Sequence, residues 1–191
     1  LLADGPTTQY VAKLGAELVP HSRRPLLAHH FYVLDTDQIN AFAAPGGHVY
    51  VTVGLMRHLN SRAELAGVMG HEIGHISGYH GANAVQTAVL TGALSDVIFG
   101  AESGWGGVAE WVVGIYLGTA HSKDLELEAD DFGVEFALAA GYNPWGLVDF
   151  FEFLLRETGP SLEIASWLSS HPKHEDRIAA STAQLEGLKI T

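Results

Sequence analysis

Two histidines and a glutamate stand together in the segment HEIGH at residues 71–75. On a helix, His71 and His75 lie about 40° apart, so both imidazoles project from one face and can bind a single ion. Glu72 lies about 100° from His71, where it can contact a water on that ion without binding the ion itself. We therefore predict a hydrolytic zinc site. Zinc would lower the pKa of the water, and Glu72 would accept its proton as the water attacks a carbonyl. The alternative is a helix face with hydrogen-bonded histidines and no metal.

Such a site needs a third protein ligand, and the residues after HEIGH do not follow the HExxHxxGxxH pattern of the metzincins. Gly78 stands where that pattern has glycine, but Gly81 replaces the last histidine and His80 comes one residue early. Both methionines, Met56 and Met69, precede the motif, so the later Met-turn of that class is missing. We reject the metzincin class and expect His80 to be a surface or helix-end histidine.

The segment DLELEADDFG, further along the chain, offers a carboxylate instead. Glu126 and Asp130 are four residues apart and share one helix face, whereas Glu128 lies about 200° from Glu126. Glu126 can therefore bind the zinc, while Asp130 accepts the free ring N–H of a ligand histidine, which we predict to be His71. The alternative is a solvated acidic face formed by Glu126, Glu128 and Asp131.

Composition limits what the rest of the molecule can be. The chain has 191 residues, 47% hydrophobic and 17% charged, which predicts one domain over residues 1–191. A formal net charge of −12, with ten Lys and Arg, leads us to expect no nucleic-acid partner. Because the chain has no cysteine, any metal must be held by His, Asp or Glu. The chain begins at Leu1, so a leader could have been removed. The sequence given contains no basic segment followed by an apolar core, the pattern of a leader.

Strand patterns predict a small sheet in the first third of the chain. FYVLD at residues 31–35 and HVYVTV at residues 48–53 are rich in aromatic and β-branched residues. The segment NAFAAPGG between them contains Pro and paired Gly, which is typical of a turn. We therefore expect two strands paired antiparallel.

Helical periodicity predicts the remaining elements. Ser61 and Glu64 can form a capping box, so the HEIGH helix should begin near residue 61. Other helices are expected over 6–19, from Ser122 to Gly141, over 145–158 and after HPKHEDR. The predicted fold class is α+β: a mostly helical single domain whose small, mainly antiparallel sheet packs on the HEIGH helix.

Residues 84–120 are apolar and rich in glycine, as a membrane hairpin would be. Polar residues interrupt the apolar runs at Gln86, Asp96, Glu102 and Glu110. No run reaches the roughly 20 residues that a membrane span needs. We therefore expect buried or lid helices and no transmembrane segment, with the glycine-rich residues 100–107 forming a mobile lid over the cleft.

Four motifs occur in order along the chain: NAFAAPGGHVYVTVGLM, ELAGVMGHEIGH, LELEADDFG with AGYNP, and SHPKHEDRI. In this order they resemble the zinc endopeptidase family that includes the HtpX heat-shock protease, the CAAX prenyl endopeptidase and the periplasmic β-barrel assembly-enhancing protease. The resemblance covers about residues 30–180. It implies that His71, His75 and Glu126 bind one zinc ion per chain and that Glu72 is the general base.

The same resemblance assigns residues that spacing alone leaves open. Asn40 and Ala41 match an edge-strand segment that hydrogen-bonds an extended substrate, a mode of binding with little sequence preference. His171 and Arg177 match an HP-xxxx-R motif in which the histidine lies near the zinc. His171 would then stabilise the oxyanion or occupy the open coordination position in a resting state. From the residues alone, His171 could also cap a turn and Arg177 could form a structural ion pair.

The membrane members of the family have transmembrane helices where this chain has residues 84–120, so the chain resembles the soluble, exported branch. The resemblance implies a zinc metalloendopeptidase that cuts unfolded, misfolded or extended protein segments in envelope quality control. Its expected location is the bacterial periplasm or the envelope. Peripheral association with a membrane and the oligomeric state both stay open. Two other classes also stay open: a zinc-stabilised binding protein or holdase with a latched site, and a zinc hydrolase that does not act on peptides.

Overall fold

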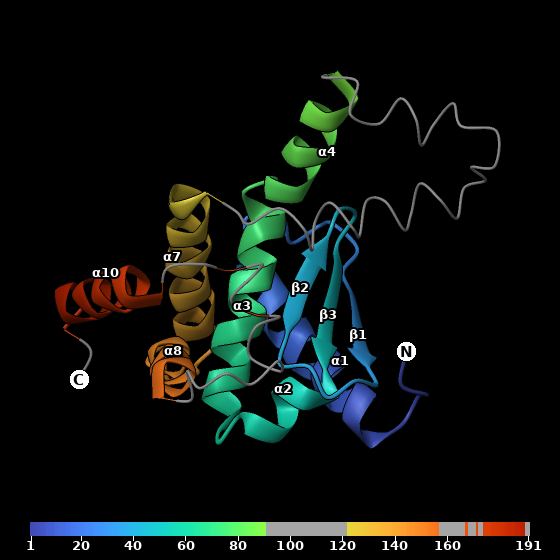
Figure 1. The fold of residues 1–191 in the computed structure, drawn as a ribbon, viewed down its shortest axis with the longest axis horizontal. Helices are drawn as coiled ribbons and strands as arrows, with labels where there is room; N and C mark the ends of the chain where they lie inside the picture. The colour runs from blue at the N-terminus through green and yellow to red at the C-terminus, as the bar shows by residue number, and fades with distance from the viewer. Residues whose placement is uncertain (91–121, 157–166, 168–170, 172–173, 190–191) are drawn as a thin grey trace.

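The computed structural model describes residues 1–90, 122–156, 167, 171 and 174–189. Its central element is helix α3, Arg62–Ser77, which carries the HEIGH motif. A three-stranded sheet lies on one side of α3, and helices α7, Lys123–Ala139, and α8, Gly146–Arg156, lie on the other (Figure 1). The fold is therefore a mostly helical α+β fold whose small sheet packs on the HEIGH helix, as the sequence predicts.

The remaining helices surround this centre. Helix α1, Pro6–Leu18, ends in the 3₁₀ turn η1, Val19–His21, and packs against the sheet. A short helix, α2, Val53–His58, connects the sheet to α3. After α3, helix α4, His80–Leu90, extends away from the sheet and the other helices, and helix α10, His174–Gly187, packs against α7 and α8 (Figure 1). The helices predicted over 6–19, from Ser122 to Gly141 and over 145–158 are confirmed within the described residues, whereas α10 begins at His174, within the HPKHEDR segment.

The sheet is mixed, in the strand order β1-β3-β2. Strands β1, His30–Leu34, and β3, His48–Thr52, run parallel to each other, so the prediction that they pair antiparallel is wrong. Between them in sequence the chain forms a third strand, β2, Ala41–Ala44, which pairs antiparallel with β3. Because β2 and β3 form a hairpin, β3 returns to the position between β2 and β1, and this return makes β1 and β3 parallel.

The predicted turn between the two strands is thus shorter than NAFAAPGG. Only its second half turns: Gly46 and Gly47 have φ values of 93° and 94°, in the left-handed region that glycine adopts readily. Residues 41–44, three of which are alanine, form strand β2. Alanine is depleted in strands, and β2 has none of the β-branched residues that mark its neighbours, so the pattern of this strand is not recognised from the sequence.

Helix α3 is buried along nearly its whole length. All residues from Glu64 to Ser77 are buried, as expected of a helix in the centre of a core. Half of the predicted capping box is confirmed at its start: the Ser61 hydroxyl accepts from the Glu64 N–H at 3.1 Å. The Glu64 carboxylate accepts instead from the N–H of Asn60, one residue before the cap, at 3.0 Å. This cap determines where the helix begins.

Helices α3 and α7 touch through their backbones. A Cβ added to Gly74 would lie 2.8 Å from the carbonyl oxygen of Ala129, and one added to Gly133 would lie 2.9 Å from the backbone nitrogen of His71. Neither distance leaves room for a side chain, so glycine is required at both positions for this close approach. Backbone contact therefore sets how far the carboxylates of α7 lie from the histidines of α3.

Within the described ranges, no helix is long and apolar enough to cross a membrane. Of the segment 84–120, the structure describes residues 84–90, which belong to α4 and are mostly exposed rather than buried. Residues 91–121, which include the predicted lid at 100–107, lie outside the described residues.

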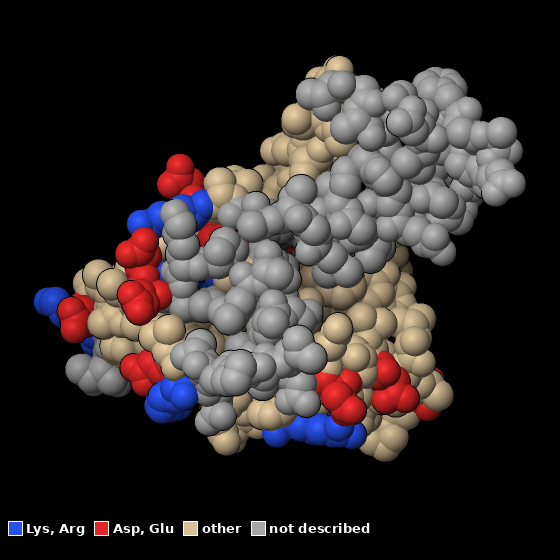
Figure 2. All heavy atoms as spheres, viewed as in Figure 1, with Lys and Arg blue, Asp and Glu red and all other residues tan. Residues whose placement is uncertain are grey.

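On the face drawn in Figure 2, the Lys and Arg side chains lie near Asp or Glu side chains. Arg23 pairs with Glu135 at 2.6 Å and Arg62 with Glu17 at 2.8 Å, all four side chains being well exposed. Such exposed pairs contribute about 0 to 1 kcal/mol each, so they add little to stability.

Candidate active site

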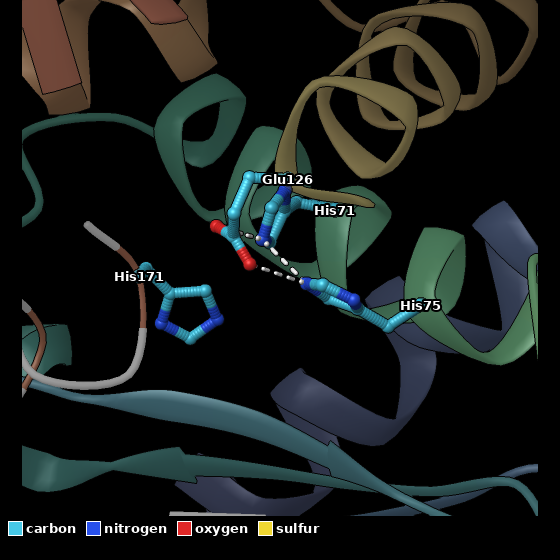
Figure 3. Close-up of side chains that lie close together, drawn as sticks. All are labelled: His71, His75, Glu126 and His171. Atoms are coloured by element: carbon cyan, nitrogen blue, oxygen red, sulfur yellow. Dashed lines mark hydrogen bonds and ion pairs between the residues drawn. The ribbon is translucent and has the colours of Figure 1, made fainter. Parts of the chain in front are cut away.

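Three buried side chains from two helices converge as the sequence predicts (Figure 3). His71 and His75 of α3 direct their Nε2 atoms at each other, 3.0 Å apart. Glu126 of α7 lies across from them, with Oε2 at 3.7 Å from the His71 Nε2 and Oε1 at 3.4 Å from the His75 Nε2. The helical spacing of HEIGH and the backbone contact between α3 and α7 together produce this arrangement.

These distances fit a single metal ion. Two ligand atoms bound tetrahedrally to zinc at 2.0–2.1 Å lie about 3.3 Å from each other. The three distances of 3.0, 3.4 and 3.7 Å among the two Nε2 atoms and the Glu126 carboxylate are close to that value. Two neutral imidazoles and one carboxylate are also a ligand set that suits zinc. His71, His75 and Glu126 can therefore hold one divalent ion.

Asp130 lies behind His71, where the spacing on α7 predicts it. Its Oδ1 is 2.8 Å from the His71 Nδ1. Arg177 of α10 binds both carboxylate oxygens of Asp130 at 2.7 Å and places its Nη1 at 2.8 Å from the Glu126 Oε2. The Arg177 side chain is 0% exposed. Its contacts are those of a residue that positions the two carboxylates of α7, and they do not include Glu72.

Glu72, the predicted general base, is fully buried beside the ligands. Burial raises the pKa of its carboxyl well above the ordinary value, and the negative charge of Glu126 raises the pKa further. The positive charge of Arg177 and the backbone of Ala43 in β2 offset part of this rise, and the His171 Nε2 lies 3.5 Å from the Glu72 Oε1. A carboxylate with a raised pKa binds a proton more readily near neutral pH, which suits a general base.

His171 lies close to the three ligands, as the resemblance implies (Figure 3). Within the described part of the chain, His71, His75, Glu126 and His171 form the group whose ligand atoms all lie within 4.8 Å of one another. Trp167 stacks on the His171 ring, with centroids 4.3 Å apart and planes 20° apart. Sequence reasoning did not select Trp167, because a lone tryptophan in WLSSHP has no spacing that indicates a role.

The two residues predicted to bind substrate lie at the start of strand β2, an edge strand of the described sheet. The Asn40 N–H donates to the Thr52 Oγ1 and its carbonyl accepts from the Thr52 N–H, both at 3.1 Å. Since main-chain groups alternate sides along a strand, Ala41 and Ala43 direct theirs away from β3. The structure thus brings the main chain of Ala41 to the open edge, joined by Ala43, whereas the main chain of Asn40 faces β3.

The sequence predicts that His80 lies at the surface or at a helix end, and the structure confirms only the helix end. It begins helix α4, which makes it a helix-end residue, but it is only 2% exposed. Its Nδ1 lies 2.8 Å from the Nδ1 of His75, and its Nε2 lies 3.1 Å from the Glu128 Oε2. Glu128, which the sequence suggests only as part of a solvated face, therefore contacts His80 and through it His75. Helix α3 ends at Ser77, between His75 and His80. The spacing of residues along a single helix therefore could not predict the contact between these two histidines.

An HExxH helix beside a buried glutamate of a neighbouring helix is an arrangement typical of metallopeptidases that bind their metal with two histidines and a glutamate. The model of Peptidase family M48 matches residues 6–184 of the chain. The chain belongs to this family of metalloproteases, and its cofactor is a metal ion.

Several characterised relatives belong to the same group. The beta-barrel assembly-enhancing protease of Escherichia coli K12 is 34% identical over 190 residues, which are 94% of this chain and 39% of that protein. The mitochondrial metalloendopeptidase OMA1 of Arabidopsis thaliana is 30% identical over 83% of this chain and 32% of its own length. Metalloprotease YcaL of Escherichia coli K12 is 33% identical over 78% of this chain and 59% of its own length. The chain thus spans about two fifths of the length of the first of these relatives.

Proposed function

We propose that the chain is a zinc-dependent metalloendopeptidase domain, formed by residues 1–191, that hydrolyses peptide bonds in unfolded or extended protein segments. The observation that carries this proposal is the convergence of His71, His75 and Glu126 beside a buried Glu72. When bound, the zinc ion lowers the pKa of a water molecule and polarises the scissile carbonyl.

The side chains around this centre divide the remaining work. Glu72 accepts a proton from the attacking water and delivers it to the leaving amine. Burial holds the pKa of His75 well below its ordinary value, so the ring stays neutral and able to bind a metal. Asp130 and Arg177 orient His71 and Glu126.

The edge of β2 supports the choice of substrate class. Ala41 and Ala43 belong to an edge strand that packs on α3, the helix that carries Glu72. A peptide in extended conformation can pair with such an edge through its own backbone, which gives affinity with little dependence on side chains. In folded proteins most extended backbone is already paired within sheets, so we infer that unfolded or misfolded segments are cut.

The relatives support a setting for this activity. The Escherichia coli K12 relative that matches 94% of this chain is named for enhancing β-barrel assembly. We infer that the chain works in protein quality control of the bacterial envelope, on the periplasmic side. Since the chain corresponds to about two fifths of that relative, it would supply the peptidase portion of such a protein.

Removal of the metal tests this function directly. We expect purified protein to contain close to one zinc per chain by mass spectrometry and to degrade unfolded casein. Treatment with a chelator should abolish the degradation, and added Zn²⁺ should restore it, because the three ligand side chains cannot activate water on their own. Zinc-loaded protein that left casein intact, in the wild type and in the His171 variant described next, would contradict the proposal.

A second candidate is a zinc-stabilised binding protein or holdase whose site is latched. The position of His171 favours it, because this ring lies with the three ligands and can occupy the fourth position on the ion. We expect His171→Ala to retain zinc and to raise casein hydrolysis by up to about tenfold, the factor for a latch worth about 1.4 kcal/mol.

The matched control for this variant is His58→Ala, which removes a histidine of α2 that hydrogen-bonds the Gly54 carbonyl. Its rate of casein hydrolysis should equal that of the wild type. A lower rate in His171→Ala than in His58→Ala would assign His171 to stabilisation of the oxyanion instead of to a latch.

A further inference from the structure

His80 is held in an unusual position between the metal site and the surface. It follows a sharp turn in which Tyr79, a non-glycine residue, has a φ of 60°. This turn directs the buried imidazole back towards α3, where it lies between His75 and Glu128. The Glu128 side chain is 50% exposed, so the three residues form a chain of contacts from the surface to the metal site.

The protons along this chain can be assigned from the chemistry of its ends. A carboxylate only accepts hydrogen bonds, so the contact at 3.1 Å places a hydrogen on the Nε2 of His80. In a neutral ring the Nδ1 of His80 is then an acceptor. Its partner at 2.8 Å, the Nδ1 of His75, must therefore carry the hydrogen, and the Nε2 of His75 keeps its lone pair.

His71 has the same tautomer, but a carboxylate fixes it instead of a histidine. Its Nδ1 lies 2.8 Å from the carboxylate of Asp130, which requires a hydrogen on that nitrogen and leaves the lone pair on Nε2. The Arg177 Nη2 is also near this Nδ1, at 3.4 Å, but the shorter contact to the carboxylate decides the assignment. Two lone pairs therefore face each other across the 3.0 Å between the Nε2 atoms, an arrangement that a shared cation stabilises.

We propose that His80 and Glu128 are positioning residues that hold His75 in the tautomer able to bind the metal, as Asp130 does for His71. This proposal rests on the proposed metal site, because it takes His75 as a ligand. Partners behind a ligand histidine fix its ring orientation and its tautomer, and their loss commonly weakens metal binding by about 10- to 100-fold.

Gly78 supports a fixed place for the His80 ring. A Cβ added to Gly78 would lie 2.2 Å from the His80 Nε2 and 2.8 Å from its Cδ2. The Gly78 φ of −80° is ordinary for alanine, so the backbone itself would accept a side chain there. The imidazole is the obstacle, and the ring occupies the space that glycine leaves open.

Zinc affinity tests the proposal, measured on the full chain by competition with a chromophoric chelator. We expect His80→Leu, which keeps bulk but removes the acceptor, to weaken Zn²⁺ binding by about 10- to 100-fold. His80→Asn keeps an oxygen near the position of Nδ1 and should restore most of that loss. Glu128→Ala should weaken binding by a smaller factor, because water can replace a half-exposed carboxylate.

Glu135→Ala is the matched control, since Glu135 lies on α7 seven residues after Glu128 and forms an exposed pair with Arg23. Its zinc affinity should equal that of the wild type. Equal affinities in His80→Leu and His80→Asn would overturn the proposal, because they would reduce His80 to a residue that fills space. A wild type that binds no Zn²⁺ would instead refute the metal site itself, so the two failures are distinct.

The tautomers can also be read directly. Long-range ¹H–¹⁵N correlation of the histidine rings should show His80 protonated at Nε2 and His75 protonated at Nδ1 in the wild type. In His80→Leu, the His75 ring should lose its preference for the Nδ1–H form. A His80 ring protonated at Nδ1 in the wild type would reverse the hydrogen bond to His75 and overturn the assignment.

Discussion

Glu72→Gln is expected to lower the rate of casein hydrolysis by about 10²- to 10⁴-fold, the usual contribution of a general base, while zinc content stays near one per chain. Glutamine has nearly the same size as glutamate, so it should fit the same buried position. It cannot accept a proton from the attacking water. Steady-state kinetics together with metal analysis by mass spectrometry measure the two quantities.

Glu64→Gln is the matched control for this change. Glu64 is a second buried glutamate of α3, but it accepts the Asn60 N–H at the start of the helix and lies about two turns from His71. Its variant should retain the wild-type rate. An unchanged rate in Glu72→Gln would remove Glu72 from the mechanism, and loss of zinc would make Glu72 a ligand instead of a base.

Arg177→Met should destabilise the protein by about 3–5 kcal/mol, the usual cost of removing one partner from a buried ion pair. The arginine is 0% exposed and binds the carboxylates of both Asp130 and Glu126. Methionine would leave these carboxylates in the core without their cationic partner. Urea denaturation followed by circular dichroism gives the free energy of unfolding. The loss should be larger after chelation, because bound zinc also neutralises Glu126.

The control for Arg177 is Arg62→Met, which removes an exposed arginine paired with Glu17. Exposed pairs contribute about 0 to 1 kcal/mol, so this variant should lose no more than that. Equal losses in Arg62→Met and Arg177→Met would show that the charge of Arg177 does not hold the two carboxylates together.

Local patterns in the sequence predict much of the candidate site. The one-turn spacing of His71 and His75 and of Glu126 and Asp130 follows from helix geometry alone. The helix starts follow from the caps at Ser61 and Ser122, which the structure shows accepting from Glu64 and Leu125. These features depend on residues within a few positions of one another, so a single sequence contains them.

The parts that sequence reasoning missed depend on contacts between distant segments. Strand pairing is one case: β1 and β3 are parallel because a third strand, low in β-branched residues, forms a hairpin with β3. His80 is another, since its partner Glu128 lies 48 residues further along the chain. Trp167 reaches His171 by stacking, which leaves no pattern of spacing in the sequence.

The glycine contact between α3 and α7 affects how strongly a metal ion can bind. Because Gly74 and Gly133 let main chains meet, the separation of the two halves of the site does not depend on side-chain rotamers. The ligands are then preorganised before the ion arrives, and little conformational entropy is lost on binding. The close packing of the two helix backbones therefore favours binding of the ion.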